Sequence, residues 1–131
     1  MYLLDTNIIL EGLLQQERSD EVRNFLESTP IEYLFLSDFS LHSIGIILFG
    51  FNKHELFIAF FRDMVLDGVT VLTLSPTELS QLEKYAQSFN LDFDDAYQYM
   101  VSEKYDLTLI SYDQDFSHTG RRAKTPSDVL S

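Results

Sequence analysis

Carboxylate side chains recur beside short apolar segments of this sequence. Asp5 directly follows the first segment, and Asp113 and Asp115 follow the last one. If such acids meet without a matching Lys or Arg, they repel one another and lose hydration, so without a cation they would hold protons or destabilise the fold. Their oxygen ligands suit Mg²⁺ or Mn²⁺, and one or two such ions could activate water for an in-line displacement at phosphorus. The predicted chemistry is metal-dependent cleavage of a phosphodiester.

The elements that would position these acids alternate along the chain. Four short apolar segments predict buried strands, at residues 2–4, 33–36, 69–72 and 107–110. Between them, apolar residues spaced three and four apart predict helices. Ser75, Pro76 and Glu78 predict a helix start with a capping box. This alternation indicates an α/β fold, a three-layer α/β/α sandwich around a central, mostly parallel sheet of four or five strands.

In such a sheet, ligand sites form beyond the carboxyl ends of the strands, near the point where the strand order reverses. Asp5 comes directly after the first predicted strand, and Asp38 lies just past the second. Asp113 and Asp115 follow the fourth strand, and Asp95 lies at the start of the helix that leads into it. We therefore expect acids from distant parts of the sequence to converge at one edge of the sheet.

Composition limits the classes of protein to which the chain can belong. At 131 residues with 45% hydrophobic content, we expect one compact domain. Nine Lys and Arg against 21 Asp and Glu give a formal charge of −12, which disfavours a general nucleic-acid coat protein. The absence of cysteine excludes a disulfide framework and a thiolate metal site. The sequence contains no recognisable secretory signal or membrane-spanning segment, so we expect a cytoplasmic protein.

Three segments of the chain resemble the three acidic motifs of PIN domains, in order and in spacing. The segments are Leu3-Leu4-Asp5-Thr6-Asn7, Phe93-Asp94-Asp95-Ala96 and Leu109-Ile110-Ser111-Tyr112-Asp113-Gln114-Asp115-Phe116. The resemblance covers nearly the whole chain and implies a single PIN-like domain over residues 1–131. PIN domains are metal-dependent ribonucleases, and many of this size are the VapC-like toxins of bacterial and archaeal toxin–antitoxin pairs.

The resemblance also implies roles for individual residues. The acids that match the family's catalytic and metal-binding positions are Asp5, Asp95, Asp113 and Asp115. The polar residues that match its supporting positions are Thr6, Asn7 and Ser111. The implied cofactor is Mg²⁺ or Mn²⁺, and the implied substrate is RNA. The implied partners are an antitoxin protein and a second copy of the chain.

One position departs from the family's pattern. Members usually carry a glutamate early in the helix after the second strand, where this chain has Ser43. A serine hydroxyl replaces a carboxylate ligand poorly. Three explanations remain: the site works with fewer acids, Asp38 supplies the missing charge as a further metal ligand, or catalysis is weakened or lost.

The acidic motifs also have purely structural explanations. Asp5, Thr6 and Asn7 are residue types that cap helices, and Asp94 and Asp95 are favoured in the first turn of a helix. We favour a metal-dependent endoribonuclease in which a metal-bound water attacks the phosphodiester, since no side-chain nucleophile or histidine base is convincing at this edge. The alternative is a catalytically impaired PIN-like module that acts in binding or dimerisation.

The segment from Phe39 to Phe51 carries more apolar residues than one core-facing helix stripe requires. If this segment is not fully buried in the monomer, it marks a subunit interface, and we expect a homodimer through it. In the alternative interpretation, Gly45 and Gly50 break the helix and let the aromatic side chains fold inward.

Overall fold

The structure is built around a sheet of four short strands. The computed structural model describes residues 1–130. The strands are β1 (Tyr2–Leu4), β2 (Leu34–Ser37), β3 (Thr70–Leu72) and β4 (Thr108–Ile110). All neighbouring strands pair in parallel, in the order β3-β2-β1-β4. The strand positions predicted from the sequence are confirmed to within one residue.

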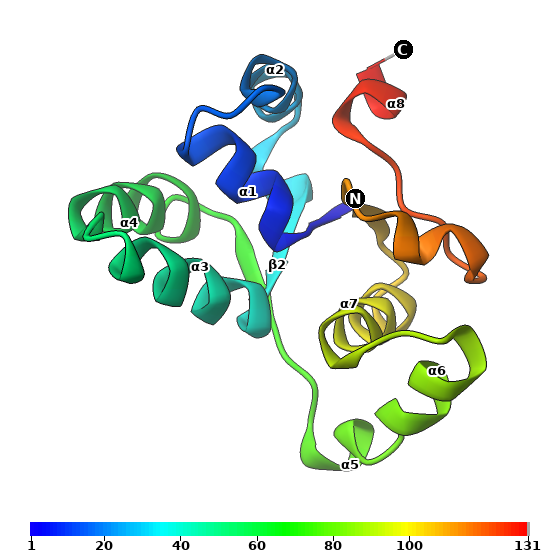
Figure 1. Cartoon of the computed structure of the whole chain (residues 1–131). Coiled ribbons are helices and arrows are strands. Elements are labelled where there is room, and N and C mark those ends of the chain that lie inside the picture. Colours follow the sequence, from blue (N-terminus) through cyan, green and yellow to red (C-terminus); the bar gives the residue numbers. More distant parts are fainter. Residues whose placement is uncertain (131) are drawn as a thin grey trace.

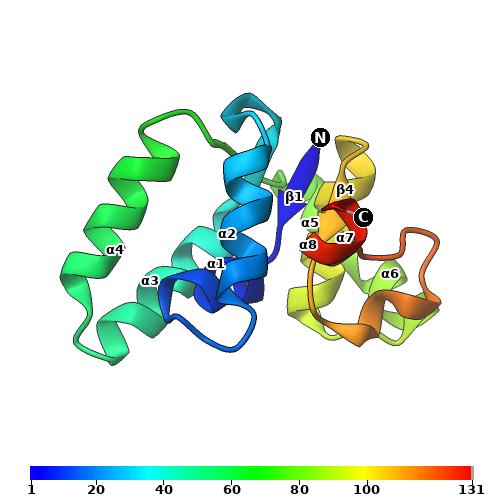
Figure 2. The same cartoon turned by 90° about the horizontal axis from the view of Figure 1, so that it is seen from above.

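Helices cover both faces of this sheet (Figure 1), which Figure 2 shows from above as two layers. One layer holds α1 (Thr6–Leu13), α2 (Ser19–Ser28), α3 (Asp38–Gly50) and α4 (His54–Phe60), which continues into the π-helical turn η2 (Phe61–Val65). The other layer holds α5 (Pro76–Leu79), α6 (Leu82–Phe89) and α7 (Phe93–Lys104). Two 3₁₀ segments are η1 (Ile31–Tyr33) and η3 (Gln114–His118), and α8 (Pro126–Leu130) packs against α2. The predicted three-layer α/β/α sandwich is confirmed.

Alternation of side chains along the strands separates two apolar cores. In β1, Leu4 packs among the helices of the α1–α4 layer, whereas Leu3 packs against α6 and α7. In β4, Ile110 and Leu109 divide in the same way. Because neighbouring residues of a strand point to opposite faces, a strand covered on both sides must be apolar throughout. The continuous apolar segments in the sequence have this cause.

Side-chain caps fix where several helices begin. The Ser75 hydroxyl accepts from the Glu78 amide at 3.2 Å, and the Glu78 carboxylate accepts from the Ser75 amide at 2.8 Å, so the predicted capping box is confirmed. Asp92 caps α7 by accepting from the Asp95 amide at 3.2 Å. Asp5 caps α1 by accepting from the Thr6 amide at 2.8 Å. The structural role of Asp5 as a cap therefore coexists with its place at the end of β1.

The strand order reverses beside β1. The chain runs from β1 to β2 and β3 on one side, and then crosses to β4 on the other side of β1. The Asp5 amide donates to the Ile110 carbonyl at 2.9 Å, which ties the carboxyl ends of β1 and β4 together. In open α/β sheets, the crevice at this reversal point is where ligands bind. Asp5, at the end of β1, and Asp113, in the loop after β4, both line a cavity there.

An apolar surface lies on α3 and α4, away from the sheet. Helix α3 runs unbroken through Gly45, so the alternative in which this glycine breaks the helix is wrong. A Cβ atom at Gly45 would lie 3.3 Å from the Phe57 ring, so the absence of a side chain at Gly45 lets α4 approach α3 closely.

Within residues 1–130, no helix has the length and apolar character needed to cross a membrane.

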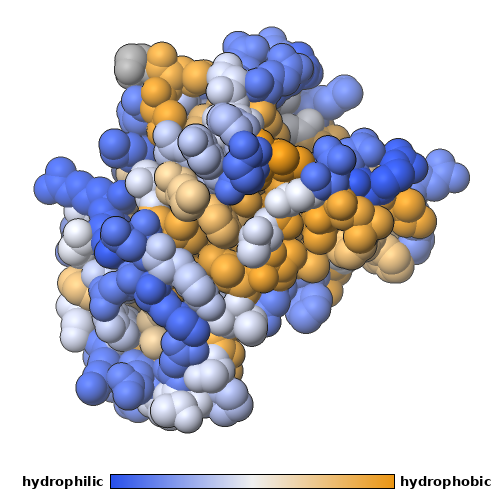
Figure 3. Space-filling model, turned by 180° about the vertical axis from the view of Figure 1, so that it is seen from behind, coloured by the Kyte–Doolittle hydropathy of each residue, from blue (hydrophilic) through white to orange (hydrophobic). Residues whose placement is uncertain are grey.

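The two helices leave a groove of about 750 Å³ between their outer sides. We call this groove the α3–α4 face; its lining residues are Leu41, His42, Gly45, Ile46, Phe49, Phe57 and Phe61. Ile46 is 74% exposed and Phe49 is 48% exposed. Seen from behind, apolar side chains form a band that extends toward the side where α4 lies (Figure 3).

Candidate metal centre

Three carboxylates gather at the carboxyl edge of the sheet. One oxygen each of Asp95, Asp113 and Asp115 lies within 4.8 Å of the others. Asp95 is buried in the first turn of α7, Asp113 caps η3 and is half-buried, and Asp115 is exposed in the first turn of η3. The Asp115 amide donates to the Asp113 carboxylate at 2.9 Å, which sets the spacing of these two acids. Residues that are distant in the sequence therefore form one acidic cluster, as expected.

A cavity of about 240 Å³ adjoins this cluster. Asp5, Asp95 and Asp113 all line it, and Asp94 contributes a further carboxylate. Among the ion pairs of residues 1–130, none reaches any of these acids. The cavity therefore concentrates negative charge without a compensating side-chain cation.

Asp5 is held by a dense set of donors. The Ser111 hydroxyl donates to Asp5 Oδ2 at 2.6 Å, and Gln98 Nε2 donates to Asp5 Oδ1 at 3.0 Å. The Thr6 amide also donates to Oδ1, and Asn7 Nδ2 reaches Oδ2 at 3.5 Å. Only 8% of Asp5 is exposed, so these bonds replace hydration that the fold removes. The carboxylate is oriented on both of its oxygens.

Ser111 connects Asp5 to the acidic cluster. Besides donating to Asp5, its hydroxyl oxygen accepts from the Asp113 amide at 3.0 Å and from Asn7 Nδ2 at 3.2 Å. Asn7 Oδ1 in turn accepts from the Tyr112 amide at 3.2 Å. Asn7 and Ser111, both singled out from the sequence, thus hold the loop after β4 against the start of α1.

Gln98 and Ser40 complete this network and were not singled out from the sequence. Gln98 Nε2 donates to Ser40 Oγ at 2.8 Å as well as to Asp5, and the Thr6 hydroxyl donates to Ser40 Oγ at 3.0 Å. Gln98 is 2% exposed, and its Oε1 atom has no hydrogen-bond partner among the described residues. The available signal was its position three residues after Asp95, which places both side chains on one side of α7.

Burial and mutual repulsion act on the protonation of the buried acids. Burial, a hydrogen bond with Asp115 and the charges of Asp113, Asp92 and Asp115 raise the pKa of Asp95 to about 8. Burial also raises the pKa of Asp5, against the opposing effect of the hydrogen bonds from Ser111, Gln98 and Thr6. Both shifts show that negative charge is costly here without a cation.

The donor set fits a hard divalent ion. Three carboxylate oxygens converge, no Lys or Arg within residues 1–130 neutralises them, and the Asp95 carboxyl holds its proton to an unusually high pH. Oxygen-only ligands of this kind suit Mg²⁺ or Mn²⁺. Asp95, Asp113 and Asp115 could hold such an ion, and Asp5 faces the same cavity.

Asp38 lies outside this cluster. Its carboxylate accepts from the Tyr97 hydroxyl at 2.5 Å, from Thr73 Oγ1 at 2.9 Å and from the Phe39 amide at 2.8 Å. These bonds tie the start of α3 to α7 and to the loop after β3. Ser43, in contrast, does line the acidic cavity, so a serine stands in the wall where a glutamate was expected.

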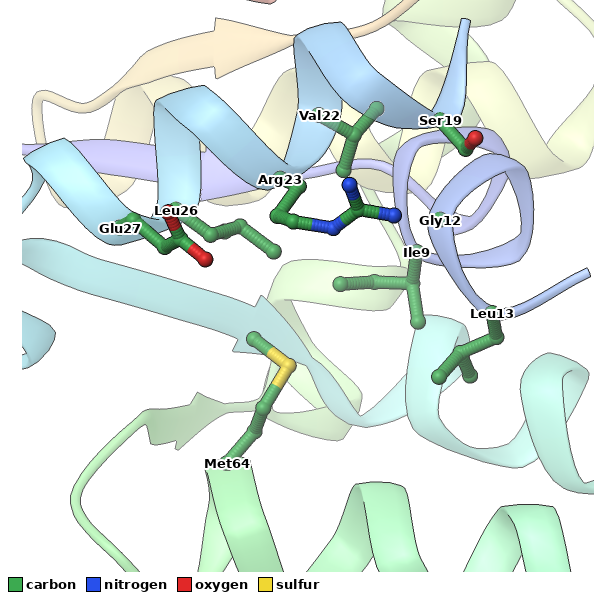
Figure 4. Close-up of a pocket in the computed structure, with 9 residues that line it drawn as sticks. All are labelled: Ile9, Gly12, Leu13, Ser19, Val22, Arg23, Leu26, Glu27 and Met64. Atoms are coloured by element: carbon green, nitrogen blue, oxygen red, sulfur yellow. The ribbon is translucent and has the colours of Figure 1, made fainter. Parts of the chain in front are cut away.

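A second cavity, of about 200 Å³, lies between α1, α2 and Met64 of η2 (Figure 4). Its walls are mostly apolar, with Ile9, Val22 and Leu26 among them. Its one cationic side chain, Arg23, is paired with Asp20 at 3.0 Å. This cavity lacks the converging oxygen ligands of the acidic one.

Comparison with known families decides the assignment. The model of the PIN domain family matches residues 2–122. The chain belongs to the PIN domain family. No curated protein sequence matches this PIN domain.

Solved structures with the same fold are similar over almost their full lengths. Mycobacterium tuberculosis VapC20, a toxin that cleaves the sarcin–ricin loop, has a TM-score of 0.81 at 18% identity, with 96% of this chain and 100% of that chain covered. FitAcB from Neisseria gonorrhoeae has a TM-score of 0.76 at 22% identity, with 97% and 99% covered. A toxin–antitoxin complex from Klebsiella pneumoniae has a TM-score of 0.74 at 20% identity, with 96% and 98% covered. At these identities the likeness establishes the fold of the PIN domain.

Proposed function

We propose that this PIN domain is a metal-dependent endoribonuclease that hydrolyses RNA phosphodiester bonds. The proposal depends above all on the approach of Asp95, Asp113 and Asp115 oxygens to within 4.8 Å of one another. These acids would hold Mg²⁺ or Mn²⁺, with Asp5 lining the same cavity. When bound, the ion would supply Lewis-acid stabilisation of charge on the phosphate and would lower the pKa of a bound water.

The chain's own residues prepare this cavity. Ser111 and Gln98 orient the Asp5 carboxylate by donating to its two oxygens. The raised pKa of Asp95 means that this acid gives up its proton when a cation enters, so metal affinity should increase as the pH rises toward 8. The side chains therefore hold the acids in place and couple metal binding to proton release.

The direct test is cleavage of an end-labelled RNA by purified protein. We expect cleavage with Mg²⁺ or Mn²⁺, none with EDTA, and a rate at least about 100-fold lower for Asp113→Asn, because a residue that holds the metal matters at least as much as its outer-shell supports. Glu32→Gln is the matched control, since Glu32 is exposed in η1, at the amino end of β2. If Asp113→Asn cleaves as fast as Glu32→Gln, the proposed centre is not the site of the reaction.

Ser43 favours a second candidate, a PIN domain whose catalysis is impaired and which acts by binding. A hydroxyl in the cavity wall gives one carboxylate fewer than the family's pattern provides. The two candidates differ in turnover and agree in metal binding. Mn²⁺ binding by calorimetry, without cleavage of any RNA tested under the same conditions, would favour the binding module.

We further propose that the protein works in the cytoplasm as the toxin of a toxin–antitoxin pair and forms a homodimer. A neighbour in fold is a toxin–antitoxin complex, which supports the search for an antitoxin. The exposed α3–α4 face supports the homodimer, because exposed apolar patches of this kind commonly mark interfaces. Co-expression with the product of an adjacent small reading frame, followed by co-purification and loss of cleavage, would test the toxin role.

A further inference from the structure

Three aromatic rings stand together beside the acidic cavity. The ring centroid of Phe39 lies 6.2 Å from that of Phe93 and 5.7 Å from that of Tyr97, and the Phe93 and Tyr97 centroids are 6.3 Å apart. Tyr97 is buried, with its hydroxyl fixed by Asp38, whereas Phe93 is 55% exposed. Phe39 and Tyr97 therefore pack against the Phe93 ring, which faces solvent. We call Phe39, Phe93 and Tyr97 the aromatic cluster.

The aromatic cluster adjoins the metal centre. Phe39 lines the same cavity as Asp94 and Asp95. Phe93 directly precedes these two acids in the first turn of α7. Phe93 and Tyr97 are four residues apart on α7, so they form a stripe next to the stripe of Asp94 and Gln98 that faces the cavity. The exposed ring is thus at the rim of the cavity.

The charge around the cavity favours an uncharged contact with RNA. Of the residues of the described chain that line the cavity, none is a Lys or Arg. The chain as a whole has a formal charge of −12. A bound cation would attract one phosphate, but the neighbouring phosphates would find few partners. Stacking of a base on an aromatic ring supplies affinity that does not depend on neutralising phosphates.

We propose that Phe93 stacks on an unpaired base of single-stranded RNA, next to the phosphate that enters the acidic cavity. The proposal rests on the proposed ribonuclease function and adds to it a residue that contacts the base. Bases in a duplex are already stacked on their neighbours and cannot cover this ring. Phe39 and Tyr97 are positioning residues that hold the Phe93 ring at the rim. Because every base has a π-face on which a ring can stack, this contact does not select among the four bases.

The test is binding of a fluorescent single-stranded RNA octamer, measured by anisotropy with Ca²⁺ in place of Mg²⁺. We expect Phe93→Ala and Phe93→Leu to weaken binding by about 5- to 150-fold, because one base–aromatic stack contributes that much. Phe93→Tyr should bind like the wild type. Tyr33→Ala is the matched control, since Tyr33 is 44% exposed in η1 at the amino end of β2. Circular dichroism verifies that each variant is folded.

An octamer of abasic nucleotides separates stacking from other effects of the substitution. The wild type should bind this strand as weakly as Phe93→Ala binds RNA, and Phe93→Ala should show no further loss on it. Equal affinity of wild type and Phe93→Ala for RNA overturns the stacking proposal, as does an equal loss on the abasic strand.

A cleavage assay on the same proteins distinguishes this failure from that of the proposed function. If the wild type cleaves the octamer with Mn²⁺ and Phe93→Ala has an unchanged KM, the stacking site is wrong and the ribonuclease stands. If the wild type neither cleaves nor binds RNA in the presence of metal, the ribonuclease function is wrong, and the stacking site falls with it.

Discussion

The acidic cavity and the α3–α4 face differ in opposite ways from the usual arrangement, in which charged side chains are exposed and apolar side chains are buried. In the cavity, carboxylates are removed from water: 8% of Asp5 and 6% of Asp95 is exposed. On the α3–α4 face, Ile46 is 74% exposed to water and Phe49 is 48% exposed. Charged residues are rarely buried without partners, and large apolar patches are rarely left open. Each region therefore supports one of the proposed partners, an ion for the first and a protein surface for the second.

The difference between the two regions lies in what controls them. If the proposals hold, the charge balance of the cavity should depend on pH, on divalent metal and on each of its carboxylates. Association of the α3–α4 face with another protein surface should instead depend on protein concentration. It should depend little on pH, because burial of apolar surface is nearly independent of pH. Changes in one region should leave the other unaffected.

The largest effect on folding should come from Asp5→Ala. The substitution removes the acceptor of Ser111, Gln98 and Thr6, and leaves buried donors without partners. We expect the free energy of unfolding to fall by about 2–4 kcal/mol, measured by urea denaturation in EDTA. Asp115→Ala is the control, because Asp115 is exposed and should change this energy by less than about 0.5 kcal/mol. Equal losses would show that Asp5 has no special structural role.

The next effect is a dependence of stability on pH in the metal-free protein. Unfolded Asp95 loses its proton near the ordinary pKa of 3.8, whereas folded Asp95 keeps it to about 8. Between these values the unfolded chain binds fewer protons, so rising pH lowers stability through this window. Calorimetry in EDTA should show a melting temperature that falls from pH 5 to pH 8.

Asp95→Asn tests the origin of that fall. The side-chain amide of this variant cannot ionise. The melting temperature of the variant should therefore exceed that of the wild type at pH 8 and approach it at pH 4. Mn²⁺ should raise the melting temperature of the wild type at pH 8 and have little effect on the variant. Asp67→Asn, which changes an exposed aspartate outside the acidic cavity, serves as the comparison. An unchanged slope in Asp95→Asn would assign the pH dependence to other groups.

A smaller gain is expected from Ser43→Glu. The new carboxylate would enter the cavity wall next to Asp5 and Asp95, so we expect Mn²⁺ to bind about tenfold more tightly, measured by titration calorimetry. His42→Glu adds the same charge on the α3–α4 face and should leave Mn²⁺ affinity unchanged. Matching gains in both variants would indicate a general charge effect.

The smallest effect on the fold should come from Ile46→Asp. Because Ile46 is 74% exposed, the monomer should lose less than about 0.5 kcal/mol of unfolding free energy. Sedimentation should nevertheless show that the proposed homodimer dissociates, with Mn²⁺ affinity unaffected. Leu66→Asp, at a residue that is 70% exposed outside the groove, should leave the dimer intact. A dimer that survives Ile46→Asp would place the subunit contact elsewhere.

Sequence patterns predicted the sheet well because its strands are buried on both faces. Continuous apolar segments located all four strands. The residues that follow them include Asp5 and Asp113, which line one cavity, and Asp115, which lies beside Asp113 in the acidic cluster. The capping box of Ser75 and Glu78 was also predictable, because it depends on residues three apart. Local rules were sufficient wherever the partners are close in the sequence.

Contacts between distant elements escaped prediction. Asp38 follows β2 as a metal ligand would, but Thr73 and Tyr97, 35 and 59 residues away, occupy its carboxylate. Gln98 looked like one polar residue within a helix, and its role depends on Asp5, 93 residues away. The orientation of such side chains is set by how α3, α7 and the loop after β3 pack, which no spacing rule in the sequence describes.

The adjacency of β1 and β4 has a consequence for biosynthesis. Asp5 and Ser111 are 106 residues apart, and Asp113 is synthesised later still. During translation, Asp5 leaves the ribosome long before β4, the second strand that pairs with β1, exists. A nascent or prematurely terminated chain therefore cannot assemble the acidic cluster. The strand order itself would therefore delay the proposed activity until β4 has paired with β1 and the acids that follow β4 have been synthesised.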